Sequence, residues 1–336
     1  MNTTNLINNK IVNKEDLLKL LNYQNEEENN NIDIYFEIVR ESISHHLRRL
    51  FGISLNWEEL LLVNNELSAL EIFIQTFCSN GEFYPINLIT NGIQLEINDL
   101  INTNKIIEEK GRRARALFLH NPHPIIGPLK DSDIAKLIDW TKKKEIFLLI
   151  DESLASLNLW EFSSCLSLNY NLFEKNIFWI WNGAKHFSLP GMEFCVIYFP
   201  KFNINNILIN YQCSPLVQFF AFKFLNDFEW TLELFEKRKL KIEKLSKQII
   251  NQLKEINELL INKIEKPTIT EWIFIDLKKF LINEKENISS FNSEYQLYKE
   301  FLKIEKIKIF RGEELGMERP GWFCFKYSNK SNKSVP

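Results

Sequence analysis

Short runs of consecutive apolar residues alternate along the chain with longer segments in which apolar residues recur every three or four positions. The short runs predict buried strands at Leu60–Val63, Ala116–Leu119, Ile146–Ile150, Ile177–Trp181 and Cys195–Phe199. The longer segments predict helices at residues 34–50, 67–78 and 131–144, the last with Asp131 as its N-cap. Strands that alternate with helices are typical of βαβ units, so the pattern indicates an α/β domain with a mostly parallel sheet.

The same pattern divides the chain into three parts. Residues 1–33 are polar and rich in asparagine, which predicts a flexible N-terminal arm. Residues 34–225 contain the α/β pattern and form the predicted large domain. Residues 226–336 contain the remainder of a long charged helical segment at 216–262 and two further strands, Trp272–Asp276 and Lys308–Phe310. This part therefore predicts a connecting helix followed by a small α+β domain.

Composition excludes several classes of protein. Of the 336 residues, 45% are hydrophobic and 13% aromatic, which supports a sizeable core and excludes a disordered chain. The 41 basic and 44 acidic residues give a net charge of −3, so the clustered positive field of a nucleic-acid binder is not expected. There are only 10 glycines, where average usage gives roughly 24, which leaves few positions for tight phosphate-binding loops.

Targeting and metal signals are weak. The first ten residues have no apolar stretch of the kind found in signal peptides, and no apolar run approaches the roughly 18 residues of a membrane-spanning helix. The five cysteines show no CxxC spacing, so we expect no metal site and a reducing, cytoplasmic setting. The adjacent histidines His45 and His46 fall on a predicted helix, where a solvated surface position is the expected one.

Two residues at predicted strand ends carry the chemistry. Asp151 follows one buried strand, and Lys185 follows another within Trp181–Gly191. With their flanking segments they resemble the class I/II aminotransferases that depend on pyridoxal 5'-phosphate (PLP), most closely the 1-aminocyclopropane-1-carboxylate (ACC) synthase-like branch. The matching segments are Asn121–Gly127, Leu149–Glu152, Asn182–Gly191, Ser214–Gln218, Trp272–Lys279 and Arg319–Phe323, whose Pro-Gly-Trp-Phe sequence is the most specific.

The resemblance implies a PLP-dependent transferase of fold type I, with a large α/β domain and a smaller α+β domain. It implies that Lys185 is the catalytic Schiff-base lysine and that Asp151 holds the pyridinium proton, since a carboxylate keeps that nitrogen protonated. It also places Asn121 and Ser68 among the cofactor-binding residues. An amino-acid substrate and a homodimer, or a heterodimer with a related subunit, are implied as partners, with no nucleic acid and no membrane.

Several positions depart from the pattern of the resembled family. Glu193 stands where an arginine clamps the cofactor phosphate, and Glu66 stands in the loop that offers backbone amides to it. Cys324 stands where an arginine binds the substrate carboxylate, and a thiol offers no bidentate fork. Arg311 or Lys326 could substitute for that arginine, although a solvated surface position is the more ordinary role for each.

The hydrogen-bonding groups around the cofactor ring differ as well. Pro124 and Leu154 replace an asparagine and a tyrosine that contact the cofactor oxygen, and Ala184 replaces the serine before the lysine. Two hypotheses follow. One is a pseudoenzyme that keeps the fold and serves as a binding partner or scaffold; the other is an active transaminase or lyase that uses Lys185.

Overall fold

The computed structural model describes residues 31–78, 82–84, 86, 97–123, 127–155, 162–168, 176–200, 213–256, 264–265, 272–281, 290–304, 308–315, 317 and 319–326. These residues fall into two compact units. The first is formed by residues 1–83, 110–122 and 128–236, and the second by residues 84–109, 123–127 and 237–336. Residues 1–30 of the predicted arm lie outside the described residues, and the first helix begins at Asn31.

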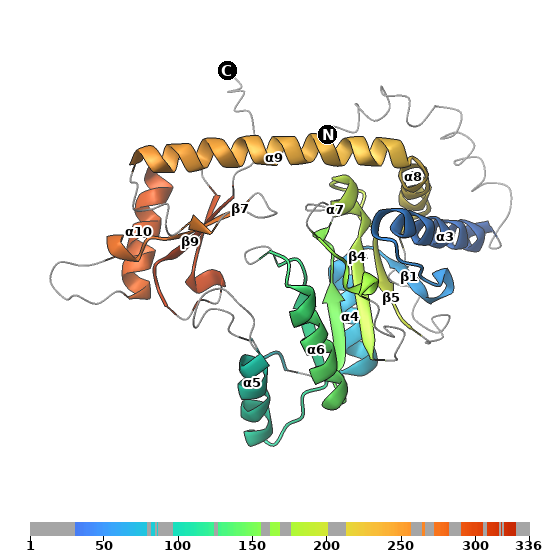
Figure 1. Cartoon of the computed structure of the whole chain (residues 1–336), viewed down its shortest axis with the longest axis horizontal. Helices are drawn as coiled ribbons and strands as arrows, with labels where there is room; N and C mark the ends of the chain where they lie inside the picture. The colour runs from blue at the N-terminus through green and yellow to red at the C-terminus, as the bar shows by residue number, and fades with distance from the viewer. Residues whose placement is uncertain are drawn as a thin grey trace. The chain divides into compact units, whose positions relative to one another are not determined.

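The first unit contains a five-stranded sheet in the order β1-β5-β4-β3-β2 (Figure 1). The strands are β1 Leu60–Val63, β2 Ala116–His120, β3 Phe147–Asp151, β4 Ile177–Asn182 and β5 Cys195–Tyr198. The pairs β2–β3 and β3–β4 are parallel, whereas β5 runs antiparallel to both of its neighbours. Four of the five strands therefore point the same way, as the alternation of apolar runs and helical segments predicts.

Helices cover both faces of this sheet. They are α3 Asn31–Phe51, α4 Glu66–Phe77, α6 Asp131–Lys143, α7 Gly183–Phe187, α8 Pro215–Asn226 and the start of α9 Phe228–Ile256, with a 3₁₀ turn at Trp57–Glu59. One face packs its apolar side chains against α4, whose Ala69, Ile72 and Phe73 are buried there. The helix α3 packs along α8 and reaches β1 (Figure 1).

Three predictions about the elements of this unit were wrong in detail. The charged segment expected as one helix is two helices, because Asp227 leaves the helical conformation and its Oδ1 accepts a hydrogen bond from Trp230 N at 3.1 Å. Asp131 is the first residue of α6, while Lys130 is its cap and makes no side-chain capping bond. His120 was expected in a turn but is the last residue of β2.

The second unit contains a four-stranded antiparallel sheet in the order β6-β7-β9-β8. The elements are α5 Ile97–Glu109, β6 Ile264–Glu265, β7 Trp272–Asp276, α10 Phe291–Ile304, β8 Lys308–Arg311 and β9 Trp322–Lys326, with 3₁₀ turns at Lys278–Phe280 and Glu313–Leu315. Its core joins Ile275, Ile309 and Phe323 to one side of α10. This unit has the α+β character expected of the C-terminal part of the chain.

Candidate functional site

The carboxyl edge of the first-unit sheet carries a row of polar side chains on one face. In the sheet register, His120 lies opposite Asp151, and Asn182 lies opposite Cys195. Side chains alternate between the two faces of a strand, so the face that carries the apolar core under α4 ends in these four groups. The ends of parallel strands are where ligand sites form in open α/β sheets, and this edge is therefore the candidate site.

Asp151 is held in place by two hydrogen bonds. Its side chain is only 4% exposed; His120 Nδ1 lies 2.9 Å from Oδ2, and Ser153 N donates to Oδ1 at 2.9 Å. Burial alone would raise the pKa of Asp151, but the hydrogen bond and charge of His120 and the bonds from Ser153 outweigh it and lower that pKa. The carboxyl group is therefore poised as a buried anion whose present partner is a histidine.

Lys185 lies at the start of the short helix α7. Asn182 caps this helix, because its Oδ1 accepts a hydrogen bond from Lys185 N at 2.8 Å. The Lys185 side chain is 48% exposed, and its Nζ forms an ion pair with Oε1 of Glu66. In this arrangement the partner of the Lys185 Nζ is therefore a carboxylate of the chain itself.

The side chain of Asn65 caps the N-terminus of α4. Asn65 Oδ1 accepts hydrogen bonds from Ser68 N at 2.9 Å and from Ser68 Oγ at 3.1 Å. Glu66 is the first residue of this helix, where a carboxylate is stabilised by the helix dipole. Glu193 lies exposed in the segment between α7 and β5. The backbone amide and hydroxyl of Ser68, a predicted cofactor contact, are thus already bonded to Asn65.

Two buried thiols at this edge were not predicted. Cys195 begins β5, and burial first, followed by the negative charges of Glu66 and Asp151, raises its pKa well above the usual value. Cys213 donates a hydrogen bond to Val63 O at 2.9 Å, and burial raises its pKa to about 12. No cysteine spacing marks this pair, because the two residues come together only when β1 and β5 pair.

Asn121 has a structural role in the described site. It is fully buried, its Oδ1 accepts a hydrogen bond from Leu129 N at 2.9 Å, and its own N–H donates to Asp151 O at 2.9 Å. It therefore fixes the chain that leaves β2 beside Asp151. Pro124, which stands at the implied asparagine position, lies outside the described residues.

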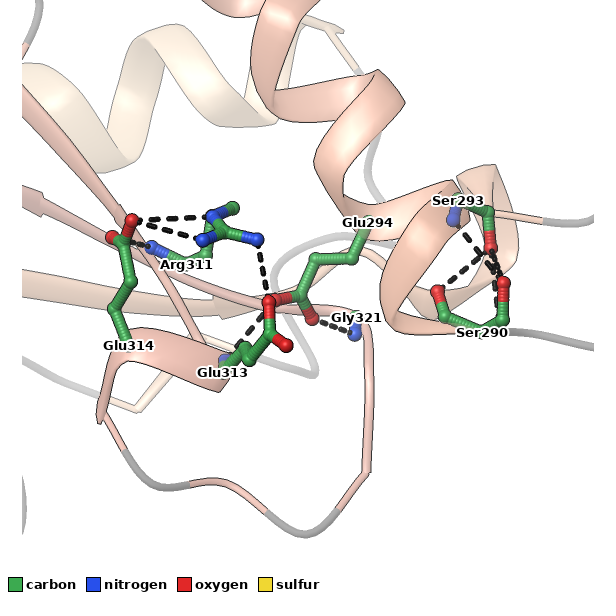
Figure 2. Close-up of polar contacts among 7 residues, drawn as sticks. All are labelled: Ser290, Ser293, Glu294, Arg311, Glu313, Glu314 and Gly321. Carbon is green, nitrogen blue, oxygen red and sulfur yellow. Dashed lines mark hydrogen bonds and ion pairs between the residues drawn. The ribbon is translucent and has the colours of Figure 1, made fainter.

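The predicted substrate-carboxylate position lies in the second unit. Cys324 is a buried residue of β9, and burial raises the pKa of its thiol to about 12. Arg311, a candidate substitute, is bonded to Glu313 at 2.6 Å and to Glu314 at 3.1 Å (Figure 2). Lys326 is part of β9, and its side chain lies outside the description. Arg311 is thus engaged by the chain's own carboxylates.

The described part of the chain contains neither a metal-binding cluster nor a membrane-spanning helix. No group of three or more histidine, cysteine, aspartate or glutamate side chains there is arranged to hold a metal ion. None of the described helices combines the length and the apolar character that crossing a bilayer requires.

Comparisons with known proteins give the fold its context. No protein-family profile matches the chain. The aromatic aminotransferase of Pyrococcus horikoshii superposes with a TM-score of 0.73 at 17% identity, covering 94% of this chain and 86% of that one. The PLP-bound C-S lyase of Staphylococcus hominis gives a TM-score of 0.65 at 15% identity, with 86% and 78% covered. The first unit with its mixed sheet and the small second sheet thus form the α/β fold of PLP-dependent transferases, fold type I.

Curated sequences narrow this class. The chain is 21% identical over 256 residues to ACC synthase-like protein 1 of Mus musculus, covering 73% of this chain and 49% of the relative. It is 23% identical over 256 residues to ACC synthase 6 of Arabidopsis thaliana, covering 73% and 50%. The chain is a divergent fold type I aminotransferase-like protein with sequence similarity to ACC synthases. It spans about half the length of the curated relatives it matches.

The similar C-S lyase of Staphylococcus hominis is bound to PLP, so the residues present can be tested for their fit to this cofactor. At the ring end the fit is good, because Asp151 is a buried carboxylate at the end of β3 and Lys185 lies on α7, directly after the adjacent strand β4. At the phosphate end the fit fails. The Ser68 amide is already bonded, and Glu66 places a carboxylate where a dianion would need donors. The site as built does not suit the phosphate group.

Proposed function

We propose that this chain is a catalytically degenerate protein of the PLP-dependent transferase fold, which serves as a binding partner or scaffold. The ion pair between Lys185 and Glu66 carries the proposal. The amine that would do covalent chemistry is bonded to a carboxylate from the neighbouring helix. The proposal is therefore that the chain keeps the fold around the site without the covalent chemistry of the lysine.

The phosphate end of the site supports the same conclusion. Asn65 already accepts the N–H of Ser68, and Glu66 and Glu193 add negative charge on the sides where phosphate would lie. Phosphate binding at a helix N-terminus depends on free N–H groups and on a favourable field. The Ser68 amide is bonded to Asn65, and the Glu66 carboxylate offsets the field of the helix, so tight binding of a phosphate ester is not expected.

We propose that the partner is a second copy of this chain or a related subunit. Leu67 and Leu216 lie in the first turns of α4 and α8 and are 72% and 44% exposed. The starts of these two helices are tied together by the hydrogen bond from Cys213 to Val63 O. Exposed leucines beside a site mark a surface that another protein can cover.

Light scattering of the wild type and of Leu67→Lys tests the proposed dimer. A wild-type dimer that is weakened in Leu67→Lys supports the proposal, and a wild-type monomer contradicts it.

The alternative is an active PLP-dependent transaminase or lyase that acts on an amino acid. The observation that favours it is the placement of Asp151 at the end of β3 and of Lys185 on α7, which follows the adjacent parallel strand β4. In that case the Lys185–Glu66 pair would have to open when the cofactor binds. An ion pair between partly exposed groups is weak enough to be opened, so a measurement has to decide.

A visible absorption spectrum decides between the two. Purified protein is mixed with PLP up to millimolar concentration, and the spectrum is compared with those of Lys185→Ala and Lys136→Ala. Lys136 is a matched control, because it is exposed and ion-paired to Asp133 at 2.8 Å. The proposal predicts no band that depends on Lys185. A band that is lost in Lys185→Ala and kept in Lys136→Ala would establish the active alternative instead.

A further inference from the structure

The carboxylate of Glu66 interacts with two positive groups, the N-terminus of α4 and the ammonium group of Lys185. Glu66 is the first residue of α4, so it lies in the positive field of the helix N-terminus. The same side chain forms an ion pair with Nζ of Lys185. Its side chain is 22% exposed, less than the 48% of the lysine, so the pair is partly shielded from solvent screening.

A second carboxylate adds to the negative charge of Glu66 at this edge of the sheet. Asp151 is a buried anion, and its charge and that of Glu66 both act on the thiol of Cys195. Cys195 therefore lies near both carboxylates and near Lys185, whose positive charge opposes their effect on the thiol. An incoming anion would therefore meet a lysine whose charge is already balanced and a carboxylate that repels it.

We infer that Glu66 is a specificity-determining residue: an internal anion that excludes phosphate-bearing ligands from Lys185. The inference rests on the proposed function, because it gives the ion pair between Glu66 and Lys185 as the reason why the site does not bind the cofactor. It predicts that a single change of charge at this position raises the affinity of the site for phosphate esters. The fold around the site needs no other change, since Asn65 keeps its capping bonds to Ser68 when Glu66 is replaced.

The test compares two probes that differ only in the phosphate, namely pyridoxal 5'-phosphate and pyridoxal. Isothermal titration calorimetry measures both on the wild type, Glu66→Gln, Glu66→Ala and Glu71→Gln. Glu71 is the matched control, an exposed carboxylate on the same helix whose Oε1 accepts a hydrogen bond from Gln75 at 3.1 Å. Circular dichroism melting confirms that each variant is folded.

The expected result is a gain of about tenfold or more in affinity for the phosphorylated probe in both Glu66 variants. The affinity for pyridoxal stays within about threefold, and Glu71→Gln behaves as the wild type. An unchanged affinity for the phosphorylated probe in folded Glu66 variants overturns the inference. An equal gain for pyridoxal, or an equal gain in Glu71→Gln, overturns it as well, because neither effect is specific to phosphate at Lys185.

The outcome is separable from that of the proposed function. A Lys185-dependent absorption band in the wild type ends the proposal of a degenerate site, whatever Glu66 does. A wild type without such a band, combined with Glu66 variants of unchanged affinity, leaves that proposal in place and removes only the role of Glu66.

Discussion

The Nε2 atoms of His46 and His186 lie 3.1 Å apart inside the first unit, and both imidazole rings are buried. His46 Nδ1 lies 3.0 Å from Leu225 O, so this nitrogen carries the hydrogen and donates it to the carbonyl. In the neutral ring Nε2 is then an acceptor, and His186 donates to it. The pair connects α7, which carries Lys185, to α3 and α8.

This pair predicts a loss of stability in mild acid. Burial, which is opposed by the bond to Leu225 O and assisted by the charge of Arg49, lowers the pKa of His46 from 6.5 to about 4. The unfolded chain binds a proton more readily between these values, so stability is complete above pH 6.5 and falls as the pH drops towards 4. We expect His46 to contribute about 2 kcal/mol of the loss between pH 7 and pH 5.

Urea denaturation at several pH values measures this contribution. His46→Gln removes the titrating ring and should have a flatter dependence of unfolding free energy on pH than the wild type. His45→Gln is the control, because it removes the exposed neighbour on the same helix and should keep the wild-type slope. If the wild type and His46→Gln have parallel curves, then the buried ring does not titrate as described.

The pair of His120 and Asp151 gives a second prediction. His120 makes the largest lowering contribution to the pKa of Asp151, and therefore His120→Ala should raise that pKa. A carboxyl with a lowered pKa stabilises the fold above its unfolded value of about 3.8 and loses this effect as the pH falls. The acid-unfolding midpoint of His120→Ala should accordingly move to higher pH.

Carbon-detected NMR titration of the aspartate carboxyl groups tests this directly. His120→Gln keeps a side-chain N–H but no charge, so the pKa of Asp151 should lie between its values in the wild type and in His120→Ala. A carboxyl that titrates identically in all three proteins would show that His120 has no influence on it.

The strands of the fold were predictable because each is a short apolar run with clear ends. All five strands of the first sheet match their apolar runs to within a residue or two. The apolar pattern does not predict helix α5, because its only buried residues are Leu100, Asn104 and Ile107. The polar Asn104 at the centre interrupts the apolar face. Strand β9 is not predicted as a strand, because its first two residues belong to the Pro-Gly-Trp-Phe motif and are interpreted only as part of it.

The members of the site were predictable, but their partners were not. Lys185, Asp151 and Glu66 could be named from the sequence, since each occupies a marked position after a strand. The contact between Lys185 and Glu66 is tertiary. The sequence alone does not show whether the charge of Glu66 faces a phosphate or a lysine. His46 was expected at the surface, and that prediction was wrong: it is 1% exposed, while His45 is exposed. Adjacent residues on a helix point in different directions, which a pair motif does not show.

Gly183 gives a prediction about the packing beneath Lys185. A Cβ added to this glycine would overlap the ring of Phe194, whose carbonyl oxygen accepts the Gly183 N–H at 3.0 Å. Gly183→Ala should lower the free energy of unfolding by about 1–3 kcal/mol because neither backbone nor ring can move freely. Urea denaturation of Gly183→Ala, Phe194→Leu and the double variant measures this. The double variant should be more stable than the sum of the single effects; strict additivity would show that the overlap is relieved elsewhere.

The last prediction concerns Glu294 in the second unit. This fully buried carboxylate accepts hydrogen bonds from Glu313 N at 3.1 Å and from Gly321 N at 2.6 Å, and so joins α10 to two separate loops (Figure 2). In Glu294→Gln one oxygen becomes a donor that faces an N–H, so the unit should lose about 1–3 kcal/mol. Hydrogen exchange should become faster at Glu313 and Gly321. Glu300→Gln, an exposed change on the same helix, should leave both amides protected. Unchanged exchange in Glu294→Gln would mean that the two loops are held without this carboxylate.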